Sequence, residues 1–171
     1  MKKFTLHEIT TLALMLSMIF VLSALEGMFP PLPFHMRFGL SNVVTMYALF
    51  FIGGRAAFTL AGLKSLSVLL MRGPVAGLLS LSGGVLSLLM IALLAAVCRN
   101  ASYFLLSVAG AITHNMGQLA VASWLTSTNL LALFPVMILA GILAGSLTAA
   151  LLRVVMPFFK RAAAPNRPGP P

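Results

Sequence analysis

The sequence predicts an all-α membrane protein, built as a bundle of six transmembrane helices. Of its 171 residues, 60% are hydrophobic and only 8% are charged, whereas a soluble domain carries about 25% charged residues. The chain therefore has too few charges to cover a globular surface. Glycine, proline and charged residues divide it into successive apolar runs, and such runs are typical of membrane-crossing helices.

The first three predicted spans are separated by a proline-rich loop and a glycine turn. The first apolar run follows a basic start and resembles a signal peptide, but about 17 residues are long for a signal core, so we expect it to remain a span. The segment EGMFPPLPFHMRF then predicts a loop. In chain order we expect a span at 9–25, the loop at 26–38, a short span at 39–52, a turn at Gly53-Gly54-Arg55 and a span at 56–71.

The second half of the chain contains three longer runs. Arg72-Gly73-Pro74 and Arg99-Asn100 mark two turns, and a short polar link precedes the last run. These breaks predict spans at 75–97, 103–126 and 130–156. The integral membrane domain then covers residues 1–156. Residues 157–171 form a polar, proline-rich tail that we expect to be cytoplasmic and disordered.

The basic residues predict how the bundle is oriented. Six spans place both termini on one side, and basic residues concentrate on the cytoplasmic side of membrane proteins. With both termini cytoplasmic, two basic residues face outward, Arg37 and Arg72, and Lys64 lies within the membrane. The other eight face inward: Lys2, Lys3, Arg55, Arg99, Arg153, Lys160, Arg161 and Arg167. Because the charges mark span ends, they favour membrane orientation over binding of nucleic acid.

Lys64 is the most informative single residue. It lies nine residues after Arg55, which places its ammonium about 14 Å into the membrane, near the middle. A charge at that depth is costly and usually faces a bundle interior, where it marks a binding site or pathway. No carboxylate lies at this depth in the predicted spans, because Glu8 and Glu26 are the only acids.

Other polar residues are expected near the depth of Lys64. His114 reaches a similar depth in the fifth span, with Asn115 beside it and Gln118 one turn further on the same face. The predicted substrate-binding set combines these with polar and glycine positions of the other spans and of the first loop: Asn42, Arg37, Arg72, Gly83 and Gly84.

Each of these residues also has a structural interpretation. His114, Asn115 and Gln118 are equally expected to hydrogen-bond neighbouring helices. Gly83 and Gly84 are more often places where helices pack closely, and Lys64 can reach a helix carbonyl or extend toward the membrane surface. The similar predicted depth of these residues in the membrane favours a substrate-binding site.

The sequence contains no strong catalytic motif. It has no aspartate, three widely spaced histidines and one cysteine, so metal-ligand spacing and an Asp-rich magnesium site are both absent. No glycine-rich loop has a Walker pattern. We therefore expect neither catalytic activity nor a cofactor or metal.

Five short motifs, in order, resemble a known family. They are the proline-rich loop, G-L-S-N at 39–42, K-S at 64–65, L-S-G-G at 81–84 and H-N-x-G-Q-L at 114–119. Together they resemble the small bacterial proteins called Gx transporters, also labelled heptaprenyl diphosphate synthase component I, over roughly residues 5–156. These proteins are similar to the substrate-binding S components of energy-coupling factor (ECF) transporters.

The resemblance implies a six-helix S-component fold in the bacterial inner membrane, with both termini inside. It implies a small-molecule ligand bound from outside, a first loop that caps the pocket, and association with a transmembrane coupling protein and two cytoplasmic ATPases. Small residues of the first span would dock on the coupling protein, here Ala13 and Ser17. Gly141 and Gly145 form a second small-xxx-small face.

We interpret the chain as the substrate-binding subunit of an ECF-type importer. The cations Lys64, Arg37 and Arg72 suggest an anionic or phosphate-bearing ligand with an apolar portion, because fixed cations in a low dielectric strongly favour an anion. Two alternatives remain open: an accessory membrane subunit for isoprenoid synthesis, and a stand-alone channel or carrier. The lack of carboxylates in the spans counts against proton coupling in the last.

Overall fold

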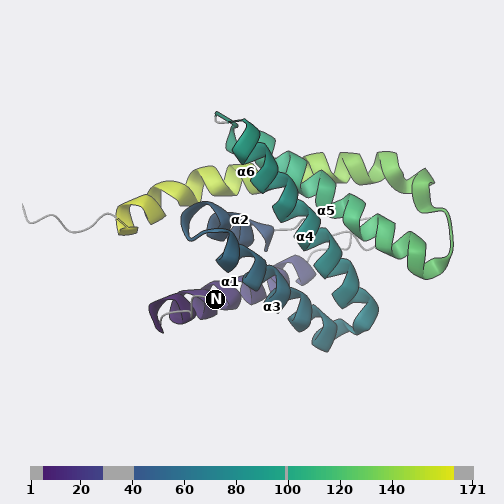
Figure 1. Cartoon of the computed structure of the whole chain (residues 1–171), viewed down its shortest axis with the longest axis horizontal. Coiled ribbons are helices and arrows are strands. Elements are labelled where there is room, and N and C mark those ends of the chain that lie inside the picture. The colour runs from purple at the N-terminus through teal and green to yellow at the C-terminus, as the bar shows by residue number, and fades with distance from the viewer. Residues whose placement is uncertain (1–5, 29–40, 99, 164–171) are drawn as a thin grey trace, which may run out of the picture.

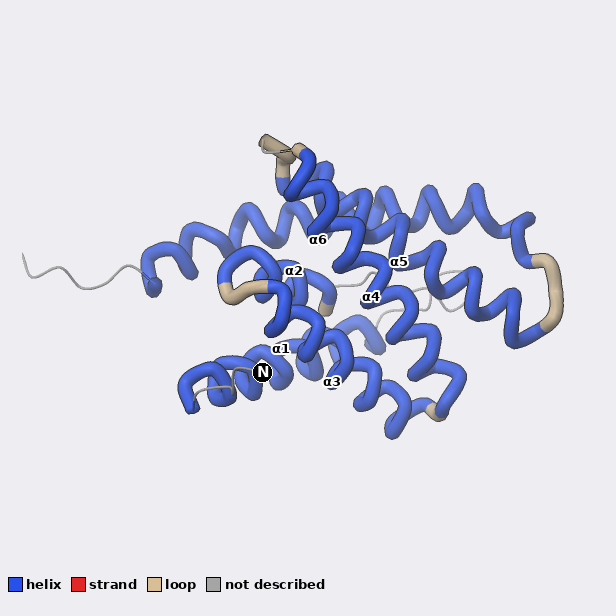
Figure 2. The backbone as a smooth tube through the Cα atoms, viewed as in Figure 1, coloured by secondary structure: helices blue, strands red, loops and turns tan. Residues whose placement is uncertain are grey.

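The computed structural model describes residues 6–28, 41–98 and 100–163, and these residues form helices joined by short turns (Figure 2). The predicted all-α membrane bundle is confirmed. In chain order the helices are α1 (Leu6–Met28), α2 (Asn42–Phe51), α3 (Gly54–Arg72), α4 (Pro74–Val97), α5 (Tyr103–Thr126), the 3-10 helix η2 (Leu130–Leu133) and α6 (Phe134–Ala163).

Five of these helices, α1 and α3 to α6, are long and apolar enough to cross a membrane. The chain is therefore a multi-pass membrane protein. The predicted second span is realised as α2, an apolar helix of only 10 residues. Such a helix rises about 15 Å, which is half of the roughly 30 Å hydrocarbon core. Most of the predicted loop, 29–38, and residues 39 and 40 lie outside the described residues.

The helices alternate in direction (Figure 1). α1, α3 and α5 run toward the end of the bundle where α4 and α6 begin, so the start of α1 and the end of α6 lie at the same end. α4 packs between α3 and α5, α6 packs on the other side of α5, and α1 and α2 pack against α3. This arrangement brings one face each of α2, α3, α4 and α5 toward a common interior.

The tight turns occur where the sequence predicted them. Gly53 and Gly73 have φ angles of 121° and 92°, a region that favours glycine because it lacks a Cβ atom. Pro74 follows as the first residue of α4, where a missing N–H costs no helical hydrogen bond. Ser102 caps α5, because its hydroxyl accepts a hydrogen bond from the Leu105 N–H at 3.2 Å.

The end of α6 differs from the prediction. The helix continues to Ala163, so residues 157–163, which we expected to begin a disordered tail, are helical. That prediction rested on the polar, proline-rich composition of the tail, which is typical of disorder. The next residues include Lys160, Arg161 and three alanines, which are good helix formers and favour continuation.

Small residues let the long helices approach closely. A Cβ atom on Gly141 would lie 2.9 Å from the Ile112 Cα atom, and one on Gly145 would lie 2.5 Å from the Val108 Cα atom. Both glycines are buried in the contact between α6 and α5. The small-xxx-small face that they form is therefore an internal helix contact, and it is covered within the chain.

Candidate functional site

A lysine and an asparagine meet between two helices inside the bundle. Lys64 lies near the middle of α3, and its ammonium donates a hydrogen bond of 2.7 Å to the side-chain oxygen of Asn42. Asn42 is the first residue of α2, so the turn at Gly53 folds α2 back beside α3 and brings the pair together. Both side chains are half-buried. Asn42 supplies a hydrogen-bond acceptor but no charge.

His114 and Gln118 form a second polar pair on α5. Their side-chain nitrogens, both Nε2, lie 3.2 Å apart, one helical turn from each other. With the Gln118 amide placed this way, its nitrogen donates and the imidazole Nε2 accepts, because an amide nitrogen is only a donor. Lys64 is close enough for its charge to act electrostatically on His114. The two pairs therefore belong to one polar cluster, which we define as Asn42, Lys64, His114 and Gln118.

Gly83 of α4 makes room for the imidazole. A Cβ atom at this position would lie 2.8 Å from both Cε1 and Nδ1 of His114, so the ring occupies the space that a larger residue would take. The Nδ1 atom is buried, and within the described residues no hydrogen-bond partner is found for it. Gly83 thus has a packing role beside the cluster. A Cβ atom on Gly84 would make only ordinary contact, 3.7 Å from the Ala61 Cβ atom.

Two of the predicted site residues, Asn115 and Arg72, are not brought into the cluster. Asn115 is buried and donates a hydrogen bond of 3.1 Å to the Met137 carbonyl oxygen, so it faces α6. Arg72 is exposed at the end of α3, two turns or about 12 Å along the helix from Lys64. Arg37 lies outside the described residues.

The predicted docking residues Ala13 and Ser17 lie on the outward face of α1. Both are exposed, and the Ser17 hydroxyl donates a hydrogen bond of 3.0 Å to the Ala13 carbonyl oxygen. The opposite face of α1 packs into the core through Leu12, Met15 and Ile19. A partner helix could therefore approach Ala13 and Ser17 without disturbing the packing of α1 against α3.

The chemistry of the cluster is that of a polar ligand site in an apolar setting. It combines one cation, two amides and one imidazole from three helices that cross or enter the membrane. Such groups bind an anionic oxygen through the ammonium and orient it through hydrogen bonds. In the part of the chain that the structure describes, no group of three or more His, Cys, Asp or Glu residues could hold a metal ion.

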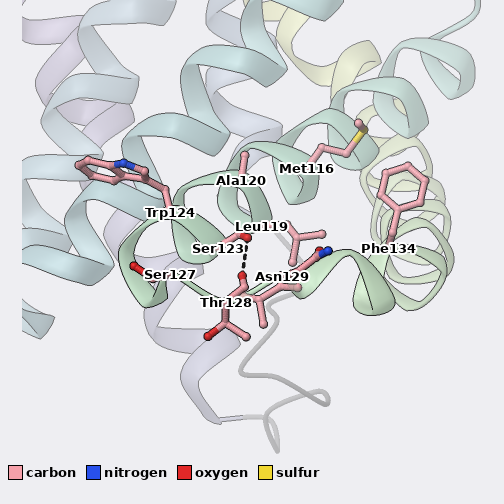
Figure 3. Close-up of a pocket in the computed structure, with 10 residues that line it drawn as sticks. Met116, Leu119, Ala120, Ser123, Trp124, Ser127, Thr128, Asn129 and Phe134 are labelled. Atoms are coloured by element: carbon pink, nitrogen blue, oxygen red, sulfur yellow. Dashed lines mark hydrogen bonds between the residues drawn. The ribbon is translucent and has the colours of Figure 1, made fainter.

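Sequence reasoning missed a surface groove at one end of α5. This α5–α6 groove has a volume of about 650 Å³ and opens to the surface (Figure 3). The sequence feature that could have indicated this groove is Ala120, a small residue between Met116 and Trp124 on one face of α5. The groove is lined by Met116, Leu119, Ala120, Ser123, Trp124, Ser127, Thr128, Asn129, Leu130 and Phe134.

The fold and the cluster define an integral membrane protein with a polar site inside a helical bundle. By its sequence, the chain belongs to the family described as heptaprenyl diphosphate synthase component I, whose profile matches residues 15–155. The match spans all five motifs in full, including K-S at Lys64 and H-N-x-G-Q-L at His114. Comparison with curated proteins and with solved structures finds no match.

Proposed function

We propose that this protein is a substrate-binding membrane subunit of the S-component kind, serving an ECF-type importer. In this proposal it binds a small anionic or phosphate-bearing compound with an apolar portion from the outer side of a bacterial inner membrane. The chain performs no chemistry itself. Two cytoplasmic ATPases and a transmembrane coupling protein supply the energy for transport.

The observation that carries the proposal is the place of Lys64. Its ammonium lies within a membrane-spanning helix and meets a neutral amide across the helix interface. A lysine at the centre of a span costs roughly 2.5–3.5 kcal/mol on insertion scales. In this proposal the ammonium binds an anionic group of the ligand, and Asn42, His114 and Gln118 orient that group by hydrogen bonds.

The exposed face of α1 supports the coupling role. Ala13 and Ser17 are small, exposed and one turn apart, which is the arrangement that lets a second helix come close in a membrane. The coupling protein is the partner proposed for this face.

The family description favours a second candidate, an accessory membrane subunit for the synthesis of heptaprenyl diphosphate. In that role the same cluster would hold the diphosphate of a lipid for a separate enzyme. The chain would remain non-catalytic, because it contains no aspartate from which an Asp-rich magnesium site could be built. Partners that co-purify in mild detergent separate the two roles: coupling ATPases support the importer, and a soluble prenyl synthase supports the accessory subunit.

The cluster is tested by Lys64→Met with Arg72→Met as its control. Both changes remove one cation from α3, but only Lys64 belongs to the cluster. Labelled pyrophosphate and a short prenyl diphosphate serve as probes for the purified, detergent-solubilised protein. We expect Lys64→Met to keep its melting temperature and to lose more than about tenfold in affinity, which is about 1.4 kcal/mol, while Arg72→Met binds normally. Unchanged affinity in a folded Lys64→Met protein would remove the cluster as an anion site.

A further inference from the structure

The α5–α6 groove lies on a different side of α5 from the polar cluster. Successive residues of an α-helix are 100° apart, so Met116 points about 200° away from His114. The groove also differs in chemistry, because none of the described residues that line it is charged. It is therefore a second feature of the molecule, independent of the function proposed for Lys64.

The groove has a polar end and an apolar end. Its polar residues concentrate in the turn Ser127–Asn129, which joins two membrane-spanning helices and so lies at the membrane surface. Its apolar residues continue from there along α5 as far as Met116, ten residues from the end of the helix. That distance is about 15 Å, half of the hydrocarbon core. The groove thus runs from head-group level through one leaflet.

Side-chain size explains the hollow. Met116, Ala120 and Trp124 follow each other at intervals of four residues on an exposed face of α5, so they form one row along the helix. The methyl group of Ala120 leaves a notch between two large neighbours. In Figure 3, Trp124 and Phe134 lie on opposite sides of this notch, and Leu119 lies between them.

Hydrogen bonds hold the polar rim in place. The Ser123 hydroxyl donates to the Thr128 carbonyl oxygen at 2.6 Å, shown as a dashed line in Figure 3. The Thr128 hydroxyl donates to the Thr126 carbonyl oxygen at 3.0 Å. The hydroxyl oxygens of Ser123 and Thr128 can still accept hydrogen bonds. The rim therefore offers neutral hydrogen-bonding groups in fixed positions, and none of the described residues that line it carries a positive charge.

We infer that the α5–α6 groove binds one single-chain amphiphile with an uncharged, hydrogen-bonding head group. The head lies at the rim Ser127–Asn129 and the hydrocarbon chain crosses the notch at Ala120 toward Met116. A volume of about 650 Å³ holds roughly twenty groups of the size of a water molecule. That is enough for one long chain with a small head, and too little for a two-chain phospholipid.

The single tryptophan of the chain makes this inference measurable. Trp124 lines the groove and is the only tryptophan in the sequence, so all tryptophan emission comes from this residue and bromine atoms in the groove quench it. The protein is reconstituted in phosphatidylcholine vesicles, and dibrominated octadecanol is added at low mole fraction. We expect saturable quenching by the alcohol. Dibrominated phosphatidylcholine should quench only in proportion to its share of the bilayer.

Two matched variants test whether the quenching arises from binding in the groove. Ala120→Phe fills the notch on an exposed position, and Ala96→Phe adds the same side chain at an exposed position of α4. Ala120→Phe should raise the alcohol concentration needed for half-maximal quenching at least tenfold, while Ala96→Phe leaves it unchanged. Circular dichroism checks that both proteins are folded. If Ala120→Phe fails to fold, Ala120→Leu is a milder substitute.

Three results would overturn the inference. Quenching by the alcohol that is only proportional to its mole fraction would show that no specific site exists. Saturable quenching by phosphatidylcholine but not by the alcohol would assign the groove to an ordinary bilayer phospholipid. A change in oligomeric state on Ala120→Phe, with quenching unaffected, would assign this face to a second copy of the chain.

Discussion

At the scale of single residues, the contact between Gly83 and His114 links packing to the polar cluster. The imidazole fills the space beside the glycine, so its position is set by α4 as well as by its own helix. Gln118 holds the other side of the ring. In the proposed site, a ring held from two sides would lose little freedom on orienting a ligand, which would favour binding.

The glycine pair Gly83-Gly84 gives a matched test of this contact. We expect Gly83→Ala to destabilise the protein by about 1–3 kcal/mol, because an added methyl group overpacks the contact with the ring and with the His114 carbonyl oxygen. Gly84→Ala should be nearly neutral, since its Cβ atom would meet Ala61 at an ordinary 3.7 Å. Thermal unfolding in detergent compares the two, and equal stabilities would argue against the close contact at Gly83.

At the scale of elements, the pairing of α5 with α6 depends on backbone contact. Gly145 packs against the backbone of Ser107 and Val108, and backbone atoms cannot move aside as a flexible side chain can. Asn115 adds a hydrogen bond to the Met137 carbonyl oxygen in the same interface. Close approach and interhelical hydrogen bonds are the forces that hold helices together in a membrane, where the hydrophobic effect between helices is absent.

Gly145→Ala is therefore expected to weaken the bundle. Its Cβ atom would lie 2.5 Å from the Val108 Cα atom, so α6 must shift, at a cost of about 1–3 kcal/mol. Gly62→Ala on α3 is the control, because nothing lies within 4 Å of an added Cβ atom there. Urea or thermal unfolding should separate the variants, and a Gly145→Ala protein as stable as Gly62→Ala would contradict the packing described.

At the scale of the whole molecule, the start of α1 and the end of α6 lie at one end of the bundle (Figure 1). This agrees with a chain that crosses the membrane an even number of times. α2 alone spans about half of the hydrocarbon core. The topology therefore depends on whether the segment between α1 and α3, which contains α2, crosses the membrane. The distribution of basic residues predicts that both termini face the cytoplasm.

Cysteine labelling on intact cells tests that orientation. Cys98 is the only cysteine and is exposed after the end of α4, while Ser127 lies past the far end of α5, about 36 Å away along a helix of 24 residues. An impermeant thiol reagent should leave the native protein unlabelled and should label the double variant Cys98→Ala/Ser127→Cys. Labelling of native Cys98 with protection at position 127 would reverse the predicted orientation.

The sequence alone was sufficient for the fold class, for most element boundaries and for part of the polar cluster. Apolar runs bounded by glycine, proline and charge predicted the five long helices, because a membrane requires helices of that length and composition. Depth along those helices placed Lys64 near His114, and helical spacing placed Gln118 on the same face as His114.

The tertiary structure decided what each polar residue faces. Spacing along one helix cannot tell which neighbour covers a given side. In a membrane the lipid-facing and the packed sides of a helix are both mostly apolar, so hydrophobicity does not distinguish them. The packing of the helices decided that Asn115 faces α6 and that the His114 imidazole lies against Gly83. It also decided that Gly141 and Gly145 pack against α5, whereas Ala120 remains exposed in a groove. Composition and order along the chain determined which groups enter the membrane, whereas contacts between helices far apart in sequence determined which of them meet.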